Sequence, residues 1–199
     1  MNVLESPRRF GPSTIWLVLF LVSQANLTRF IGALNPSFFE MQFAFSPAKY
    51  SEILQAWGPT GVTLYRLHFS YDLIHPLIFG ALGWVAVQTS PVFDGLTVTK
   101  ERFYRWLLPV AAGFDYIENT CQLKLLSFPT GIVDWLVPVS ATCASIKWIL
   151  AFGFTLVFVW RLLQWGVRHE ARFNVPLILS HEEPRRARGK TTGWLGSNR

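Results

Sequence analysis

Residues 60–88 read TGVTLYRLHFSYDLIHPLIFGALGWVAVQ, a long apolar stretch with an acidic residue, Asp72, and a histidine, His75, near its centre. A helix of this length, rising 1.5 Å per residue, can cross a hydrocarbon core of about 30 Å, and Pro76 predicts only a kink in it. A carboxylate at mid-membrane costs roughly 2.5 to 3.5 kcal/mol even on lenient scales, so such a group faces a partner or water. The stretch therefore predicts a transmembrane helix with a polar centre that has a structural or functional role.

The composition of the whole chain agrees with a membrane protein. Of its 199 residues 51% are hydrophobic, and they include 9 Trp and 17 Phe, which is more than a soluble domain of this size needs. The formal net charge of +6 comes from basic residues gathered at the two ends and in one loop. This placement indicates orientation in a membrane, so we predict no nucleic-acid partner.

Three further apolar stretches complete a set of four predicted spans: residues 14–34, 60–88, 101–128 and 139–165. Between the first two, Ser46-Pro47 is a typical helix start and Gly58-Pro59 a typical helix end. The helix between them is amphipathic and is expected to lie along the membrane surface with Trp57 at headgroup level. The predicted fold is an all-α, polytopic four-helix bundle with this interfacial helix.

Basic residues predict the orientation. Arg8, Lys100 and Arg161 flank ends of the predicted spans that would all face the cytoplasm, together with both termini. Residues 1–13 would then be a cytoplasmic segment, 14–167 the membrane domain and 168–199 a basic, disordered cytoplasmic tail. An alternative for the start of the chain is a secretory signal ending near Ala25.

Charged residues of the predicted spans share one depth, and they are Arg29, Asp72, Asp115, Glu118 and Lys147. Each lies about 12 to 15 residues from the cytoplasmic end of its span, which is roughly 18 to 23 Å into the membrane. Two cations and three carboxylates nearly balance, and burial of any one alone would be unfavourable. We therefore expect a single internal cluster, with His75 in the same layer.

The cluster supplies candidates for several roles. The catalytic candidates are Asp72, Asp115, Glu118, Arg29 and Lys147, and the substrate-binding candidates are Asn119, Tyr65 and Tyr116. His75 could join the three carboxylates as ligands of a divalent transition metal, with one position open for water. The chain has no HExxH motif, and the cofactor stays undetermined. The structural alternative pairs Asp72 with Arg29 and Glu118 with Lys147 only to fix the register of the helices.

The two cysteines, Cys121 and Cys143, lie at similar predicted depths in the third and fourth spans. They form neither a CxxC motif nor a zinc-binding pattern. Packing residues are the first interpretation, and a disulfide in an oxidising compartment is the alternative.

Several short motifs resemble those of a family of small four-span integral membrane proteins that is common in bacteria. The motifs are Gly58-x-x-Gly61-x-x-x-Tyr65, Asp72-x-x-x-Pro76, Asp115-Tyr116-x-Glu118-Asn119 and Lys147-Trp148. The resemblance covers about residues 57–160. It implies a four-span fold in which the acids and Lys147 are a shared feature, and it implies no particular reaction.

The leading functional prediction is a small membrane enzyme, of hydrolase or cyclase type, that acts on a lipid-like or isoprenoid substrate. Asp115 and Glu118 would act as general acid and base, or bind a metal, while Arg29 and Lys147 stabilise developing negative charge. One alternative is a non-enzymatic subunit or assembly factor of a membrane complex, and another is a proton-coupled transporter. The expected partners are membrane lipid, a lipophilic small molecule, and a second copy or a partner subunit.

Overall fold

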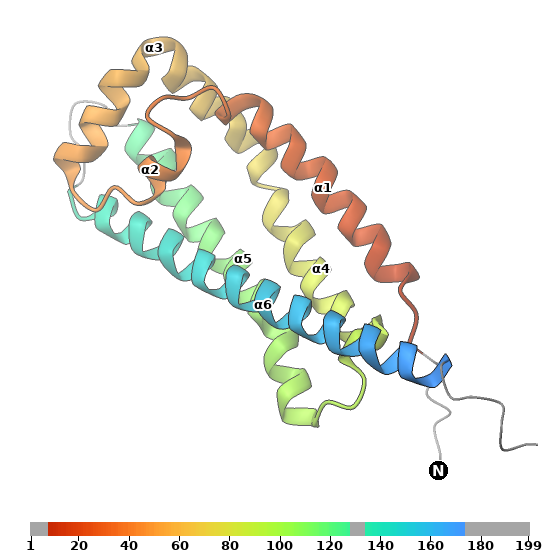
Figure 1. Ribbon diagram of the computed structural model, residues 1–199. Coiled ribbons are helices and arrows are strands. Elements are labelled where there is room, and N and C mark those ends of the chain that lie inside the picture. Colours follow the sequence, from red (N-terminus) through yellow and green to blue (C-terminus); the bar gives the residue numbers. More distant parts are fainter. Residues whose placement is uncertain (1–7, 128–133, 174–199) are drawn as a thin grey trace, which may run out of the picture. The chain divides into compact units, whose positions relative to one another are not determined.

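The computed structural model describes residues 8–127 and 134–173, and the chain divides into two units, 1–165 and 166–199. All the secondary structure in the described ranges is helical (Figure 1). The elements are α1 (Gly11–Ile31), α2 (Phe38–Gln42), α3 (Pro47–Asp72), α4 (His75–Thr89), the 3-10 turn η1 (Pro91–Phe93), α5 (Val98–Ser127) and α6 (Leu136–Phe173). The all-α prediction is confirmed for the described residues.

Among these elements, α1 and α6 are each long and apolar enough to cross a membrane. The pair α3 and α4 passes the same test as one bent span, with an angle of 41° at the break. Large apolar side chains on α1 and α6 are exposed, for example Ile15, Val18, Ile149 and Leu156. Such a surface is unfavourable in water and suits contact with lipid, so the chain is a membrane protein.

Most of α5 coincides with the third predicted span, but α5 does not qualify as a span by composition. It carries Lys100, Glu101, Arg102 and Arg105 in its first turns, and buried acidic residues further along. Its apolar side chains pack on α4 and α6, as in the cluster that joins Leu108, Ala112 and Phe154. The length of α5 and its position in the sequence are as predicted. Its polar side chains lower its mean hydropathy, and its apolar side chains contact other helices.

Gly58 divides α3 into two arms, as the Gly58-Pro59 pair predicts. Its φ of +61° lies in the left-handed region, which glycine adopts without a Cβ penalty. At the start of α3, Ser46 Oγ accepts a hydrogen bond from the backbone N–H of Lys49 at 3.2 Å. The helix start and the interruption are therefore both read correctly from the sequence.

Protein covers the apolar face of the first α3 arm. Tyr50 and Ile53 are fully buried, in one core cluster with residues of α5 and the start of α6. The Trp57 indole is 7% exposed, and its Nε1 donates to the carbonyl of Pro36 at 2.6 Å. Trp57 is therefore covered by protein, and its place at headgroup level stays a prediction. Helical periodicity identifies an apolar face without telling whether protein or lipid covers it.

Glycines allow α4 and α5 to approach closely. A Cβ built on Gly83 would lie 2.5 Å from Leu108 Cβ, and one on Gly80 would lie 3.3 Å from Ala112 Cβ. Small residues at such a contact let two helix backbones pack tightly in a membrane. The close contact limits the rotation of α5, which carries the acidic motif Asp115-Tyr116-x-Glu118-Asn119.

Two internal or terminal stretches of the chain bear on the predicted domain bounds. Most of the predicted tail, from 174 onward, lies outside the described residues, whereas 168–173 continue α6 as helix and not as a disordered segment. Residues 128–133 between α5 and α6 also lie outside the described residues.

Candidate functional site: a buried charge cluster beside an apolar cavity

Lys147 of α6 lies between the two acidic residues of α5. Its Nζ is 2.6 Å from Glu118 Oε2 and 2.9 Å from Asp115 Oδ1. Exposure is 7% for Lys147, 3% for Asp115 and 1% for Glu118, so the pairs are shielded from solvent. The two acids are three residues apart and therefore share one helix face, which here is turned toward α6. The predicted common layer is confirmed for these three residues.

Gln42 of α2 completes this group, and sequence analysis did not identify it. Its amide Nε2 donates to Glu118 Oε1 at 2.8 Å, and its Oε1 accepts from the indole Nε1 of Trp148 at 2.9 Å. The signal available in the sequence was a capping box that precedes it. Ser37 and Glu40 form that box at the start of α2, and it predicts a helical turn in the connection between the first two spans.

On the opposite side of the site lie His68, Asp72 and His75, from α3 and α4. The Nδ1 of His68 is hydrogen-bonded to the carbonyl oxygen of Tyr65, and its Nε2 is 3.7 Å from Asp72 Oδ2. A carbonyl can only accept, so His68 Nδ1 carries the proton of that bond. His75 Nδ1 is 2.9 Å from Ser23 Oγ of α1. All three side chains are buried.

The break between α3 and α4 explains the hydrogen bonds of two residues of the acidic motif. Pro76 has no N–H to offer the carbonyl of Asp72, and Leu77 bonds to Ile74, so the carbonyls of Asp72 and Leu73 lack their usual helical donors. The hydroxyl of Tyr116 donates to the Leu73 carbonyl at 2.7 Å, and Nδ2 of Asn119 lies 3.5 Å from the Asp72 carbonyl. These two side chains stabilise the bent span.

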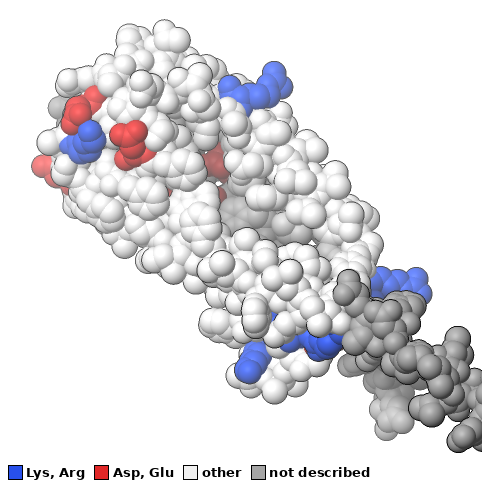
Figure 2. All heavy atoms as spheres, viewed as in Figure 1, with Lys and Arg blue, Asp and Glu red and all other residues white. Residues whose placement is uncertain are grey.

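A cavity of about 680 Å³ separates α1 from α6 and reaches the charge cluster. Its walls are mainly apolar and include Leu17, Phe20 and Leu27 of α1 and Trp148, Phe154 and Phe158 of α6. Figure 2 shows this face of the molecule hollowed, with acidic atoms visible inside the hollow.

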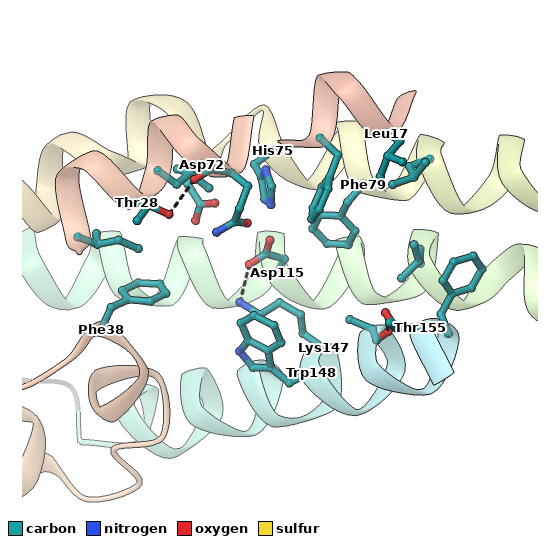
Figure 3. A pocket seen from close by; sticks show the side chains of 18 of the residues that line it. Leu17, Thr28, Phe38, Asp72, His75, Phe79, Asp115, Lys147, Trp148 and Thr155 are labelled. Carbon is teal, nitrogen blue, oxygen red and sulfur yellow. Dashed lines mark hydrogen bonds and ion pairs between the residues drawn. The ribbon is translucent and has the colours of Figure 1, made fainter. Parts of the chain in front are cut away.

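The ionisable residues gather at one part of the cavity. His68, Asp72, His75, Asp115 and Lys147 all line it. In Figure 3, Asp72 and His75 point from one side toward Asp115, and Lys147 approaches Asp115 from the other side. The arrangement offers a volume suited to a lipophilic molecule, with proton donors and acceptors around one part of it.

Other predicted site residues lie elsewhere. Arg29 is exposed on α1 and does not belong to the buried cluster, so its expected pairing with Asp72 is wrong. Equal depth does not imply the same side, because each residue turns the helix by about 100°. Tyr65 is 1% exposed within an aromatic core, and neither it nor Glu118, Asn119 and Tyr116 lines the cavity.

The predicted metal ligands do not form a metal-binding group. Within residues 8–127 and 134–168, whose side chains the structure describes, no three His, Cys, Asp or Glu side chains are arranged to hold a metal ion. Lys147 occupies the place between Asp115 and Glu118, and His75 is engaged by Ser23. The ammonium group of Lys147 already lies between the two carboxylates, so this set of donors is a poor fit for a metal cation.

Cys121 and Cys143 are both buried free thiols. Cys121 belongs to the core cluster of Tyr50 and Leu125. The first interpretation, packing residues, agrees with the structure, and the alternative of a disulfide does not.

Comparison of the chain with models of protein families, with curated proteins and with solved structures gives no match. The resemblance carried by the short motifs therefore stays a prediction, and functional inference depends on the geometry described above.

Proposed function

We propose that this chain is a multi-pass membrane enzyme that acts on a lipid-like or isoprenoid molecule by acid and base chemistry. One observation carries the proposal: an apolar cavity of about 680 Å³ whose lining includes His68, Asp72, His75, Asp115 and Lys147. The apolar walls would hold hydrocarbon, and the ionisable groups would surround the polar or reactive part of the molecule. Placing ionisable groups in a membrane is costly, which favours a working role for them.

In this proposal, Asp115 and His75 exchange protons with the substrate. They approach the cavity from different helices, as a general acid and base must when they serve two sides of a reacting group. Lys147 balances the charge of Asp115 through the 2.9 Å contact and keeps the carboxylate in place. Glu118 supports Lys147 from outside the cavity, so its role is positioning and not direct proton transfer.

The proposal includes a four-span topology with both termini in the cytoplasm. The spans would be α1, the bent pair α3 and α4, α5, and α6. Support comes from arginines gathered at one end, where Arg8 pairs with Asp94 at 3.4 Å and with Glu101 at 3.1 Å. Arg161 donates to the carbonyl of Asp94 in the same region. Single cysteines at Thr97 and Gln55, tested with a membrane-impermeant thiol reagent, should be labelled from opposite sides.

The test of the enzyme proposal compares the lipids of cells that express the protein with those of cells that express Asp115→Asn. At equal protein abundance, at least one lipophilic species should change with the original protein and not with the variant. Asp134→Asn is the matched control, because Asp134 is an exposed carboxylate away from the cavity. His75→Asn is a second variant if Asp115→Asn reduces abundance. Identical lipid profiles for the original protein and the folded variants would refute the proposal.

A second candidate function is a non-enzymatic subunit whose charge cluster only locks the bundle. The network of Lys147, Glu118, Gln42 and Trp148 favours it, because these groups satisfy one another without a ligand. In that case Asp115→Asn should lower protein abundance and leave lipid profiles unchanged. Loss of a co-purifying membrane partner in the same variant would support this second function.

A further inference from the structure

We infer that the molecule bound in the cavity is a lipophilic cation, such as a long-chain or polycyclic amine in its protonated form. The inference rests on the proposed function, since it names the class of ligand for the same cavity. It depends on three observations about the side of the cavity formed by α3 and α4: its charge, its hydrogen-bonding groups and its aromatic rings.

The charges of the site do not balance. Three carboxylates lie in or beside the cavity, and Lys147 pairs with two of them, Asp115 and Glu118. No lysine or arginine in the described part of the chain forms an ion pair with Asp72. With both imidazoles neutral and the three carboxylates ionised, the site carries one excess negative charge at Asp72. A buried charge needs a compensating one, and a cationic ligand would supply it.

The hydrogen-bonding groups on this side of the cavity are acceptors that lack a donor. His68 Nδ1 is committed to the Tyr65 carbonyl, so in the neutral ring Nε2 is an acceptor. This Nε2 has no hydrogen-bond partner, and it lies 3.7 Å from Asp72 Oδ2. Both residues line the cavity, with exposures of 1% and 6%.

Two neighbouring acceptors discriminate between ligand classes. A protonated amine has N–H donors for both Asp72 Oδ2 and His68 Nε2, and its charge balances the carboxylate. An alcohol has a single donor and no charge. A carboxylate or phosphate ligand would add negative charge beside Asp72. Of these three ligand classes, the cationic one matches both the charge of Asp72 and the unpartnered nitrogen of His68.

Aromatic rings around the same side would also favour a cation. Phe38 lies 5.4 Å from the ring of His68, and Phe20 and Phe79 lie 5.4 and 5.5 Å from the ring of His75. All three phenylalanines line the cavity. Their negative ring faces attract cations, and their edges and the adjacent apolar walls accommodate hydrocarbon.

The test uses the full chain in nanodiscs of phosphatidylcholine and a dodecylamine probe that carries a photoreactive diazirine in its chain. Mass spectrometry identifies labelled peptides of α1 and α6. Unlabelled dodecylamine, dodecanol and dodecanoate then compete for the labelled position. The three competitors have the same hydrocarbon length, so any difference in how well they compete comes from the polar group.

Dodecylamine should compete roughly 10- to 100-fold better than dodecanol, as expected for a charge-assisted hydrogen bond, and dodecanoate should compete least. Asp72→Asn should remove most of the preference for the amine over the alcohol, and Asp134→Asn should leave it unchanged. The comparison of competitors in the original protein decides the question even if Asp72→Asn does not fold.

Equal competition by amine and alcohol would overturn the cation inference, because it would mean that Asp72 is neutral or is already balanced by a protonated His68. The proposed lipophilic cavity would stand in that case. Failure of all three competitors to displace the probe from α1 and α6 would instead count against the proposed function itself. The two failures are therefore distinguishable.

Discussion

Replacing Lys147 by methionine tests whether the buried cluster depends on charge. The substitution keeps an unbranched side chain of similar length and removes the ammonium that lies 2.6 Å from Glu118 and 2.9 Å from Asp115. Both acidic residues are at most 3% exposed, so solvent does not replace the lost partner. Removing one member of a buried ion pair costs about 3 to 5 kcal/mol, because the remaining charge is uncompensated.

A much smaller value is expected if the contacts act only as ordinary hydrogen bonds between membrane helices. Such bonds contribute about 0.6 kcal/mol on average and at most about 1.7 kcal/mol. Lys147 makes two such contacts, so their loss would cost about 1.2 kcal/mol on average, which lies below the roughly 3 to 5 kcal/mol expected for an uncompensated charge. Neutralising one acid in the same molecule, as Lys147→Met with Glu118→Gln, should recover part of the loss, because one uncompensated charge disappears.

The assay is reversible unfolding in mixed micelles, with helix content followed by circular dichroism as the fraction of denaturing detergent rises. Lys124→Met is the matched control, because Lys124 is an exposed lysine on α5 and its replacement should change stability by less than about 0.5 kcal/mol. A loss of about 1 kcal/mol or less for Lys147→Met, or no recovery in the double variant, would refute the charge-based account.

Three further variants probe other contacts with the same unfolding assay. Gln42→Leu should cost about 1 to 3 kcal/mol, because it leaves a buried carboxylate oxygen and an indole N–H without partners; a neutral result would show that α2 is not tied to the cluster. Tyr116→Phe should cost about 1 kcal/mol through the unpaired Leu73 carbonyl, whereas Tyr71→Phe, which removes an exposed hydroxyl, should cost less. Arg29→Ala should leave stability within about 0.5 kcal/mol, and a loss comparable to that of Lys147→Met would place Arg29 in the cluster after all.

The sequence predicts the helices well because length and apolar content are local properties. The second span was expected at 60–88, and α3 and α4 together cover it, with the break next to the expected Pro76 kink. The pairing of Glu118 with Lys147 also follows from depth, since a helix rises by a fixed amount per residue. Local spacing along α5 then places Asp115 beside the same ammonium.

What the sequence cannot supply is the rotation of each helix and the path of its connections. Arg29 was expected at the depth of the cluster, but it lies on an exposed side of α1. Gln42 reaches Glu118 and Trp148 across 76 and 106 positions of the sequence, from a connection that looks too polar to enter the bundle. Such contacts depend on tertiary packing, and no periodicity within one segment encodes them.

The cluster has two sides, and this division reconciles its structural and chemical interpretations. On one side, Glu118 and Gln42 are buried around Lys147 and satisfy it, so their substitution should affect stability first. On the other side, Asp72 has no lysine or arginine partner in the described chain, and Nε2 of His68 beside it has no hydrogen bond. A fold selected for stability alone gains little from these two groups, because a buried carboxylate without a lysine or arginine partner and a buried nitrogen without a hydrogen bond both cost free energy. Their position in the lining of an apolar cavity indicates that a ligand, and not the protein, completes this side.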